Sequence, residues 1–515
     1  MRMMLTRVTR RLVVCGALTV APMAVTAPML AATCESLTSV KLSNATIDAA
    51  QTVPAGAFTV PGEAGNVAAS SAYKKLPAFC RVTATLTPSS DSDIKVEVWL
   101  PVSGWNKKLQ VVGNGGWAGS ISYSALAAAV ADGYASASTD TGHTGRSAAF
   151  ALGHPEKVVD VAYRAVHEMT VKAKAMVAAY YGSAASLAVW NGCSTGGQQG
   201  VTEAMKYPDD FNAIVAGASA VHHLSLHIAR VDLDAFENRS AESYIPPTKY
   251  GLIHDAVLKA CDALDGVKDG VIENPLACHF DPKVLACKGA DSSDCLNAAQ
   301  VETAAALYAP VKNPTTGGRL MPALLMPGSE LGWATIAGPQ PNDLALDGLR
   351  YVEFQDAGWD WHKFNAATDI DRALKADNGL LDATDPNLKP FFDRGGKLLM
   401  YHGWADPQVT PLDSVEYFND VVKTLGAGVV GKSIELYMVP GMNHCRGGVG
   451  TDTFDKMGAM EQWIATGSAP KQIVASHLTG GSVDRTRPLC PYPQVAAYKG
   501  SGSTDDAANF ACRVK

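Results

Sequence analysis

The chain has 515 residues, of which 47% are hydrophobic and 18% are charged, and its formal net charge at pH 7 is −7. This composition is typical of an ordinary globular protein that is long enough for two domains, or for one domain with a large insertion. Because no basic excess is present, nucleic acid and an anionic membrane are not expected as binding partners.

The first 32 residues are predicted to be a cleaved signal peptide. Arginines without any acidic residue precede an apolar stretch, and small residues follow between Ala27 and Ala32. Pro22 and Pro28 interrupt the apolar stretch, so a permanent transmembrane helix is not expected. The protein is therefore expected to be secreted or periplasmic, with Sec and twin-arginine export both left open.

The cysteines support an oxidising compartment. Of eleven cysteines, only Cys15 lies in the predicted signal peptide. The ten that remain are an even number, which argues for five disulfides in an exported protein. The count alone does not give the pairing, although Cys287 and Cys295 are near enough to close a small loop.

Strands and helices alternate in the first part of the mature chain. Apolar patterns predict two strands within residues 93–113, then an alanine-rich helix and a longer helix over about residues 157–181. The segment SLAVWNG predicts a short buried strand, the helix after it is expected to end near Pro208, and FNAIVAGAS predicts the next strand. This alternation predicts a mostly parallel sheet with helices on both faces.

The alternation stops over residues 221–387, where cysteines, proline- and glycine-rich connections and aromatic pairs gather. It resumes with GGKLLMYHG, SIELYMV and QIVASHL, each expected to be a strand, with helices between them. The simplest interpretation is one α/β domain, formed by residues 33–220 and 388–515, that is interrupted by an insertion at residues 221–387.

The segment GCSTG at residues 192–196 fits the pattern G-x-S-x-G. In this pattern, flanking glycines allow a sharp turn from strand to helix that exposes the serine hydroxyl. The pattern alone is weak, but here a predicted strand precedes it and a predicted helix follows. Ser194 is therefore the candidate nucleophile, which needs a base and an acid that orients the base.

Two later loops supply the acid and the base in the order serine, aspartate, histidine that is found in α/β-hydrolases. Asp406 lies in GWADPQVTP and His444 in PGMNHC. A helix N-cap before Pro407 is the alternative role for Asp406. His402 precedes the acid and is expected to pack or hydrogen-bond nearby, while His143 precedes the serine and is interpreted as structural.

Backbone amides are expected to hold the oxyanion of the tetrahedral intermediate. The Thr195 N–H, directly after the nucleophile, is one candidate donor. The second is expected from the glycine-rich segment GNGG, with Gly115 as first choice and Gly116 as the alternative. The histidines His222, His223 and His227 lack the acidic or cysteine partner of a zinc site, so they are interpreted as packing of the insertion or lining of a pocket.

These segments together resemble the tannase and feruloyl esterase family, which includes the mono(hydroxyethyl) terephthalate hydrolases. The resemblance rests on GCSTGG, GWADPQVTP, PGMNHC, CDALDGVKDGVIENPLACHFDP and FQDAGWDWHKF, and it spans nearly all of the mature chain. It implies an α/β-hydrolase fold with a large lid-domain insertion. It also implies a serine carboxylesterase that cleaves feruloyl, other hydroxycinnamoyl or galloyl esters through an acyl-enzyme.

In that family the cysteine before the nucleophile is bonded to the cysteine after the catalytic histidine. The resemblance therefore implies a disulfide that would hold the loops of the nucleophile and the base together. It implies five pairs in all: Cys193–Cys445, Cys34–Cys80, Cys261–Cys278, Cys287–Cys295 and Cys490–Cys512.

The resemblance also implies a structural calcium ion in the insertion. The implied ligands are three carboxylates and two backbone carbonyls, those of Asp262, Asp265, Asp269, Val267 and Val271. These hard oxygen donors suit calcium, and glycines at 266 and 270 permit a tight loop around an ion. The spacing is not that of an EF-hand.

The substrate contacts are the least defined part of the sequence. Aromatic residues of the insertion, Trp333 and Phe354 among them, could stack on a flat acyl group. Arg350 lies four residues before Phe354, a spacing that resembles the carboxylate-reading arginine of the terephthalate hydrolases, but Gln355 stands where a serine is expected. Three other interpretations stay open: a terephthalate monoester hydrolase, a serine peptidase, and a non-catalytic binding protein on the same fold. The sequence gives no oligomeric state.

Overall fold

The computed structural model describes residues 32–62, 73–117 and 119–514. The predicted signal peptide lies outside the described residues except for its last position. Within those ranges no helix is both long and apolar enough to cross a bilayer.

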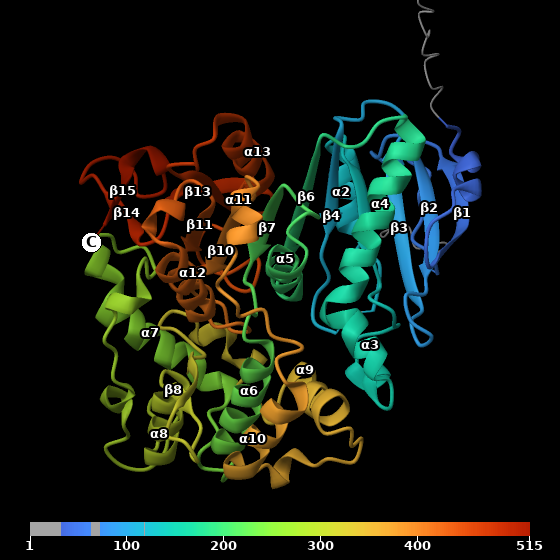
Figure 1. The fold of residues 1–515 in the computed structure, drawn as a ribbon. Helices are drawn as coiled ribbons and strands as arrows, with labels where there is room; N and C mark the ends of the chain where they lie inside the picture. The colour runs from blue at the N-terminus through green and yellow to red at the C-terminus, as the bar shows by residue number, and fades with distance from the viewer. Residues whose placement is uncertain (1–31, 63–72, 118, 515) are drawn as a thin grey trace, which may run out of the picture.

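A nine-stranded sheet forms the centre of the molecule (Figure 1). Its strands, in spatial order, are β1 (Ala45–Val53), β2 (Phe79–Leu86), β3 (Ile94–Pro101), β5 (Ala135–Thr139), β4 (Lys108–Val112), β6 (Leu187–Cys193), β7 (Ala213–Gly217), β10 (Lys397–Gly403) and β11 (Ile434–Val439). The strands from β5 to β11 are parallel, whereas β1, β2, β3 and β5 pair antiparallel. The prediction of a mostly parallel sheet is confirmed.

Helices cover both faces because successive strand residues point to opposite sides of the sheet. Trp190 packs with helices on one face, while its neighbour Val189 packs with a helix on the other. The first face is covered by α4 (Ala165–Tyr181), α5 (Thr195–Lys206) and α12 (Pro411–Leu425). The second is covered by α2 (Tyr123–Ala131) and α13 (Lys456–Thr466). A short α3 (Pro155–Val159) and a π-helical turn (Asp160–Arg164) lead into α4.

The chain leaves the sheet after β7 and returns to it at β10, so the structure places the insertion between these strands. It contains α6 (His223–Glu237), α7 (Tyr250–Cys261), α8 (Ala298–Leu307), α9 (Asp343–Asp347), α10 (Ala366–Asp377) and the hairpin of β8 (Pro310–Lys312) with β9 (Arg319–Ala323); α11 (Lys389–Asp393) follows it. Figure 1 shows this segment, green to gold, gathered below the sheet. Two apolar clusters, made almost entirely of its own residues, stabilise it.

The C-terminal region differs from the expected continuation of strand and helix. The segment QIVASHL forms β12 (Ile473–Thr479), but this strand pairs with β13 (Ser482–Leu489) in a separate hairpin and does not join the sheet. A second hairpin follows, β14 (Gln494–Tyr498) with β15 (Phe510–Val514). The apolar pattern predicted the strand correctly but could not identify its partner, because a nearby antiparallel neighbour satisfies its backbone equally well.

The described residues form five disulfides, and they are the five pairs that the resemblance implied. Four of them close loops of 8 to 46 residues. The Cys193–Cys445 bond joins positions that are 252 residues apart. Cys193 is the last residue of β6, and Cys445 lies in the loop after β11. This bond is therefore the one that fixes distant parts of the chain relative to each other.

Candidate active site

The three candidate catalytic residues meet at one edge of the sheet. Ser194 directly follows β6, Asp406 follows β10, and His444 follows β11. These strands are parallel members of the run β6-β7-β10-β11, so their carboxyl ends lie at the same edge. Ligands of open α/β sheets bind outside these ends.

Ser194 occupies a sharp turn between β6 and α5. Its backbone has φ 65° and ψ −128°, a conformation that L-residues rarely adopt. The turn requires glycines on both sides: a Cβ at Gly192 would lie 2.3 Å from the Gly196 carbonyl oxygen, and one at Gly196 would lie 2.9 Å from that of Asn114. The sequence GCSTG thus forms the strand–turn–helix geometry of a nucleophile elbow.

Asp406 is fully buried and orients His444. One carboxylate oxygen accepts hydrogen bonds from the backbone amides of Gln408 (2.7 Å) and Val409 (3.0 Å). The other lies 2.7 Å from His444 Nδ1. Burial acts to raise the pKa of this carboxyl, but His444 and His402 with their hydrogen bonds outweigh it and hold the pKa below its ordinary value. An ionised Asp406 fixes the Nδ1–H tautomer of His444 and leaves Nε2 free to act as a base.

His402 shares the second oxygen of Asp406 but has no access to a substrate. Its Nε2 lies 3.1 Å from that oxygen, its Nδ1 lies 2.8 Å from Ser414 Oγ, and its side chain is fully buried. His143 is also enclosed, with Nε2 2.6 Å from the Trp117 carbonyl and its ring stacked on Phe150. Both histidines therefore have structural contacts of the kind that the sequence indicated.

The Cys193–Cys445 disulfide links the two sides of the site. Cys193 immediately precedes Ser194, and Cys445 immediately follows His444, with a Cα–Cα distance of 6.1 Å. Cys445 has a positive φ of 65°, as does Ser194. Because each cysteine is next to a site residue in the chain, the disulfide limits how far Ser194 and His444 can separate.

The glycine-rich loop after β4 lies against the elbow. Thr195 begins α5, and its side-chain hydroxyl donates a hydrogen bond of 3.2 Å to the Gly116 carbonyl. Gly116 lines the pocket beside Ser194, whereas Gly115 is exposed and is not part of its lining. The structure thus places the alternative, Gly116, at the pocket and the first choice, Gly115, outside its lining.

A small pocket of about 20 Å³ lies beside Ser194. Its lining comes from the elbow, the glycine-rich loop, the insertion and the acid loop: Gly116, Trp117, Ser194, Thr195, Ala220, His223, Leu226, His227, Arg230, Leu344, Gln408 and Val409. His223 and His227 thus line a pocket, one of the two roles considered from the sequence. His222 instead pairs with Asp413.

The predicted substrate contacts, Arg350, Phe354 and Trp333, do not line this pocket. Trp333 is fully buried in an apolar cluster of the insertion. Phe354 packs edge-on against Trp359, and Arg350 donates to the Trp359 carbonyl at 3.0 Å. These residues stabilise the insertion, and aromatic content alone could not distinguish its interior from its substrate-facing side.

Trp117, Leu344 and Arg230 line the pocket but were not identified from the sequence as contacts. Trp117 directly follows the glycine-rich segment GNGG, and Leu344 has no sequence signal. Arg230 did have one: it lies three residues after His227 and seven after His223, so the three share one face of α6. Polar residues at that spacing, just after a strand that neighbours the nucleophile, mark a helix facing a site.

The loop that was predicted to bind calcium has the expected donors. Asp262 is buried, and its carboxylate accepts backbone N–H bonds from Asp269 (3.3 Å) and Gly270 (3.2 Å). Asp265 accepts one from Val267 (2.9 Å), and both Gly266 and Gly270 have positive φ. The donors are all oxygen, which fits a hard cation such as calcium.

This loop also contacts the C-terminal hairpins. Asp269 Oδ2 lies 2.6 Å from Arg487 Nη2 on β13, and Glu273 accepts a hydrogen bond of 2.7 Å from the Ala496 amide on β14. The loop therefore connects the insertion to the end of the chain.

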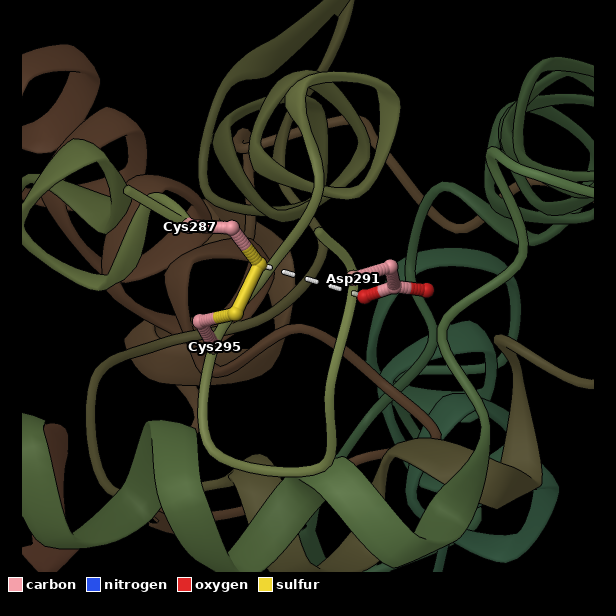
Figure 2. Close-up of side chains that lie close together, drawn as sticks. All are labelled: Cys287, Asp291 and Cys295. Atoms are coloured by element: carbon pink, nitrogen blue, oxygen red, sulfur yellow. Dashed lines mark hydrogen bonds between the residues drawn. A yellow bond between two sulfur atoms is a disulfide. The ribbon is translucent and has the colours of Figure 1, made fainter. Parts of the chain in front are cut away.

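In the described part of the chain, two groups of side chains have potential metal-ligand atoms within 4.8 Å of one another. The three aspartates of the 262–271 loop are not one of these groups. One group is Cys287, Asp291 and Cys295, shown in Figure 2. Both sulfurs are bonded to each other there, so neither is a thiolate that could bind a metal, and the 3.9 Å contact with Asp291 involves no S–H.

The second group is His167, Glu203 and Asp210, near the C-terminal end of α5. His167 Nδ1 lies 2.6 Å from Asp210 Oδ2, and Lys174 Nζ lies 3.6 Å from the other oxygen. Burial and the nearby Asp210 raise the pKa of Glu203, which favours the neutral form of Glu203. The group needs no metal to account for it.

The parallel strands, the elbow and an aspartate–histidine pair in this chain order define an α/β-hydrolase. The chain belongs to the tannase and feruloyl esterase family, whose model matches residues 80–513. It is 37% identical to an uncharacterized esterase of Xanthomonas campestris over 93% of this chain and 91% of that protein. It is 32% identical to a probable feruloyl esterase B-1 of Aspergillus oryzae over 93% of each.

A solved structure agrees with this membership. The crystal structure of feruloyl esterase B from Aspergillus oryzae matches with a TM-score of 0.87 and 31% identity, covering 93% of this chain and 99% of that chain. The protein is a carboxylic ester hydrolase with the α/β-hydrolase fold.

Proposed function

We propose that the protein is a secreted serine esterase that hydrolyses esters of aromatic acids, of the feruloyl or galloyl type. The observation that carries the proposal is the 2.7 Å contact between Asp406 and His444, with His444 tied to Ser194 through the adjoining disulfide. The similarity to a probable feruloyl esterase supports the substrate class.

In this mechanism Ser194 Oγ attacks the ester carbonyl while His444 Nε2 takes its proton. The bond to the alcohol then breaks, and His444 returns the proton to the leaving oxygen, which gives an acyl-enzyme and a free alcohol. Asp406 stabilises the imidazolium that forms in between. The Thr195 amide and one glycine amide, of Gly116 or Gly115, hold the oxyanion.

A water molecule completes the cycle. His444 removes a proton from the water as its oxygen attacks the acyl carbon, and the proton is then returned to Ser194 Oγ. The products are the carboxylic acid and the free enzyme.

Hydrolysis of methyl ferulate and methyl gallate tests this function. Ser194→Ala should lower kcat by about 10⁴-fold or more on both esters, because the remaining groups only bind the substrate and the oxyanion. Circular dichroism and the thermal midpoint should match those of the unmodified protein. Turnover by Ser194→Ala at the unmodified rate would refute the assignment.

We also propose a calcium ion in the 262–271 loop and export through the signal peptide. The oxygen donors of Asp262, Asp265 and Asp269 support the first, where a bound calcium ion would supply positive charge that holds the carboxylates together. Five disulfides support the second, since they persist in oxidising compartments. N-terminal sequencing of the exported protein would establish whether cleavage falls near residue 32.

A further inference from the structure

The insertion packs against the loop that carries Asp406. This acid loop, residues 404–410, joins β10 to α12. The side chain of Val409 is buried in the larger apolar cluster of the insertion, and the Thr410 hydroxyl donates a hydrogen bond of 2.6 Å to the Ala323 carbonyl on β9. The acid loop is therefore held by the insertion as well as by the sheet.

Arg230 of α6 adds a charged contact to this loop. It is 3% exposed, and its Nη2 donates a hydrogen bond to the Gln408 carbonyl. That carbonyl belongs to the same trans peptide unit as the Val409 N–H, so the two groups point in opposite directions. The Val409 N–H donates to Asp406 at 3.0 Å. One peptide unit thus connects the guanidinium to the Asp406 carboxylate.

The charge of Arg230 strengthens this connection. Burial lowers the pKa of the guanidinium to about 10, while the charges of Asp406 and Asp234 act to raise it, so Arg230 is charged at neutral pH. A charged donor bonds more strongly to a carbonyl than a neutral one, and it polarises the peptide unit so that its N–H becomes a better donor. A better donor stabilises the ionised form of Asp406, which is the form that orients His444.

The space beside Arg230 is too small for a substrate group. The pocket that Arg230 lines next to Ser194 measures about 20 Å³, which is enough for one water molecule but not for an acyl ring. The hydrogen bond that Arg230 donates in the structure goes to the acid loop. Arg230 is therefore placed to act on the protein and not on the substrate.

We propose that Arg230 is a positioning residue for the catalytic acid. Through the peptide unit of Gln408 and Val409 it holds Asp406 where the carboxylate orients His444. The insertion thereby supports the catalytic triad directly. This inference rests on the proposed esterase function and names a further residue on which that site depends.

Steady-state kinetics on methyl ferulate and methyl gallate tests the inference. Arg230→Met should lower kcat about tenfold to 100-fold on both esters alike, with KM unchanged, because a displaced acid weakens the transition state and not substrate binding. Arg230→Lys keeps a cation that can donate to the carbonyl and should regain most of kcat. Arg230→Gln, a neutral donor, gives the same test as Arg230→Met should the latter not fold.

Arg239, just after α6, supplies a matched control. Its guanidinium also donates to backbone carbonyls, but all of its hydrogen bonds are to residues of the insertion. Arg239→Met should therefore keep both kcat and KM.

Proton NMR gives a readout that does not depend on turnover. The hydrogen on His444 Nδ1, bonded to an ionised carboxylate, should resonate far downfield, and its loss in His444→Gln assigns the signal. Arg230→Met should shift or broaden this signal, whereas Arg230→Lys and Arg239→Met should retain it. A purely structural role of Arg230 within α6 would leave the signal unchanged.

An unchanged kcat together with an unchanged Nδ1 signal in Arg230→Met would overturn the inference. A loss confined to KM, or to one of the two esters, would also overturn it, because Arg230 would then be a substrate contact. No hydrolysis of either ester by the unmodified enzyme would instead refute the proposed function, and the Nδ1 signal would still report whether Arg230 positions Asp406.

Discussion

The strand ends and the α6 face border the same pocket, but they differ in how fully their polar groups are bonded. The two oxygens of Asp406 have contacts with two amides and two histidines, all within 3.1 Å. Across the pocket, Arg230 Nε and His223 Nε2 have no partner. A completed network holds its groups in place before a substrate binds, whereas unpaired buried groups gain hydrogen bonds only from a ligand.

This difference assigns separate roles to the two regions. Changes at the strand ends should reduce turnover of every ester alike, because they remove interactions formed in the transition state. Changes of Arg230 on α6 should do so to a smaller extent, because this residue acts through Asp406. Changes elsewhere in the insertion should affect stability more than turnover.

The largest effect should distinguish the two histidines that share Asp406. His444→Gln should lower kcat by about 10⁴-fold on all esters, because the general base is lost. His402→Gln should lower it by less than about 100-fold, since Asp406 keeps its contacts with His444 and with both amides. Steady-state kinetics on methyl ferulate measures both variants. The opposite order of effects would make His402 the base.

The disulfide beside the site should have an intermediate effect. Cys193→Ser with Cys445→Ser should lower kcat about tenfold or more, while the circular dichroism spectrum stays unchanged. Without the disulfide the loops of Ser194 and His444 can shift apart, and small displacements of catalytic groups slow the reaction strongly. Cys287→Ser with Cys295→Ser is the matched control, since that bond lies in the insertion (Figure 2). If the Cys193→Ser, Cys445→Ser variant kept full turnover, the role of this disulfide would be limited to stabilising the fold.

The smallest effect on turnover is expected at the calcium loop. Adding calcium to EDTA-treated protein should raise the thermal midpoint by roughly 3 °C, because an ion that binds only the folded state stabilises it. Asp262→Asn should remove this response, whereas Asp291→Asn, at an exposed aspartate outside the loop, should retain it. A midpoint that does not respond to calcium would contradict the proposed site.

The sequence predicts the strand-end region well because its signals are local. The turn at Ser194 needs Gly192 and Gly196 directly beside it, and the acid and base follow strands in a fixed order. The pocket side is harder to predict. Trp333 and Phe354 are as aromatic as Trp117, and only the packing of distant helices decides which ring lines the pocket beside Ser194. Arg230 belongs to no motif, and its unpaired Nε becomes evident only when its neighbours are known.

In the proposed mechanism Ser194 is the nucleophile and His444 activates it. A fluorophosphonate probe, followed by peptide mass spectrometry, tests it most directly because the probe bonds only to an activated serine. We expect one label per chain on the peptide that contains Ser194, with none on Ser194→Ala and much slower labelling of His444→Gln. A label on another serine, or an unlabelled protein that still hydrolyses methyl ferulate, would contradict it.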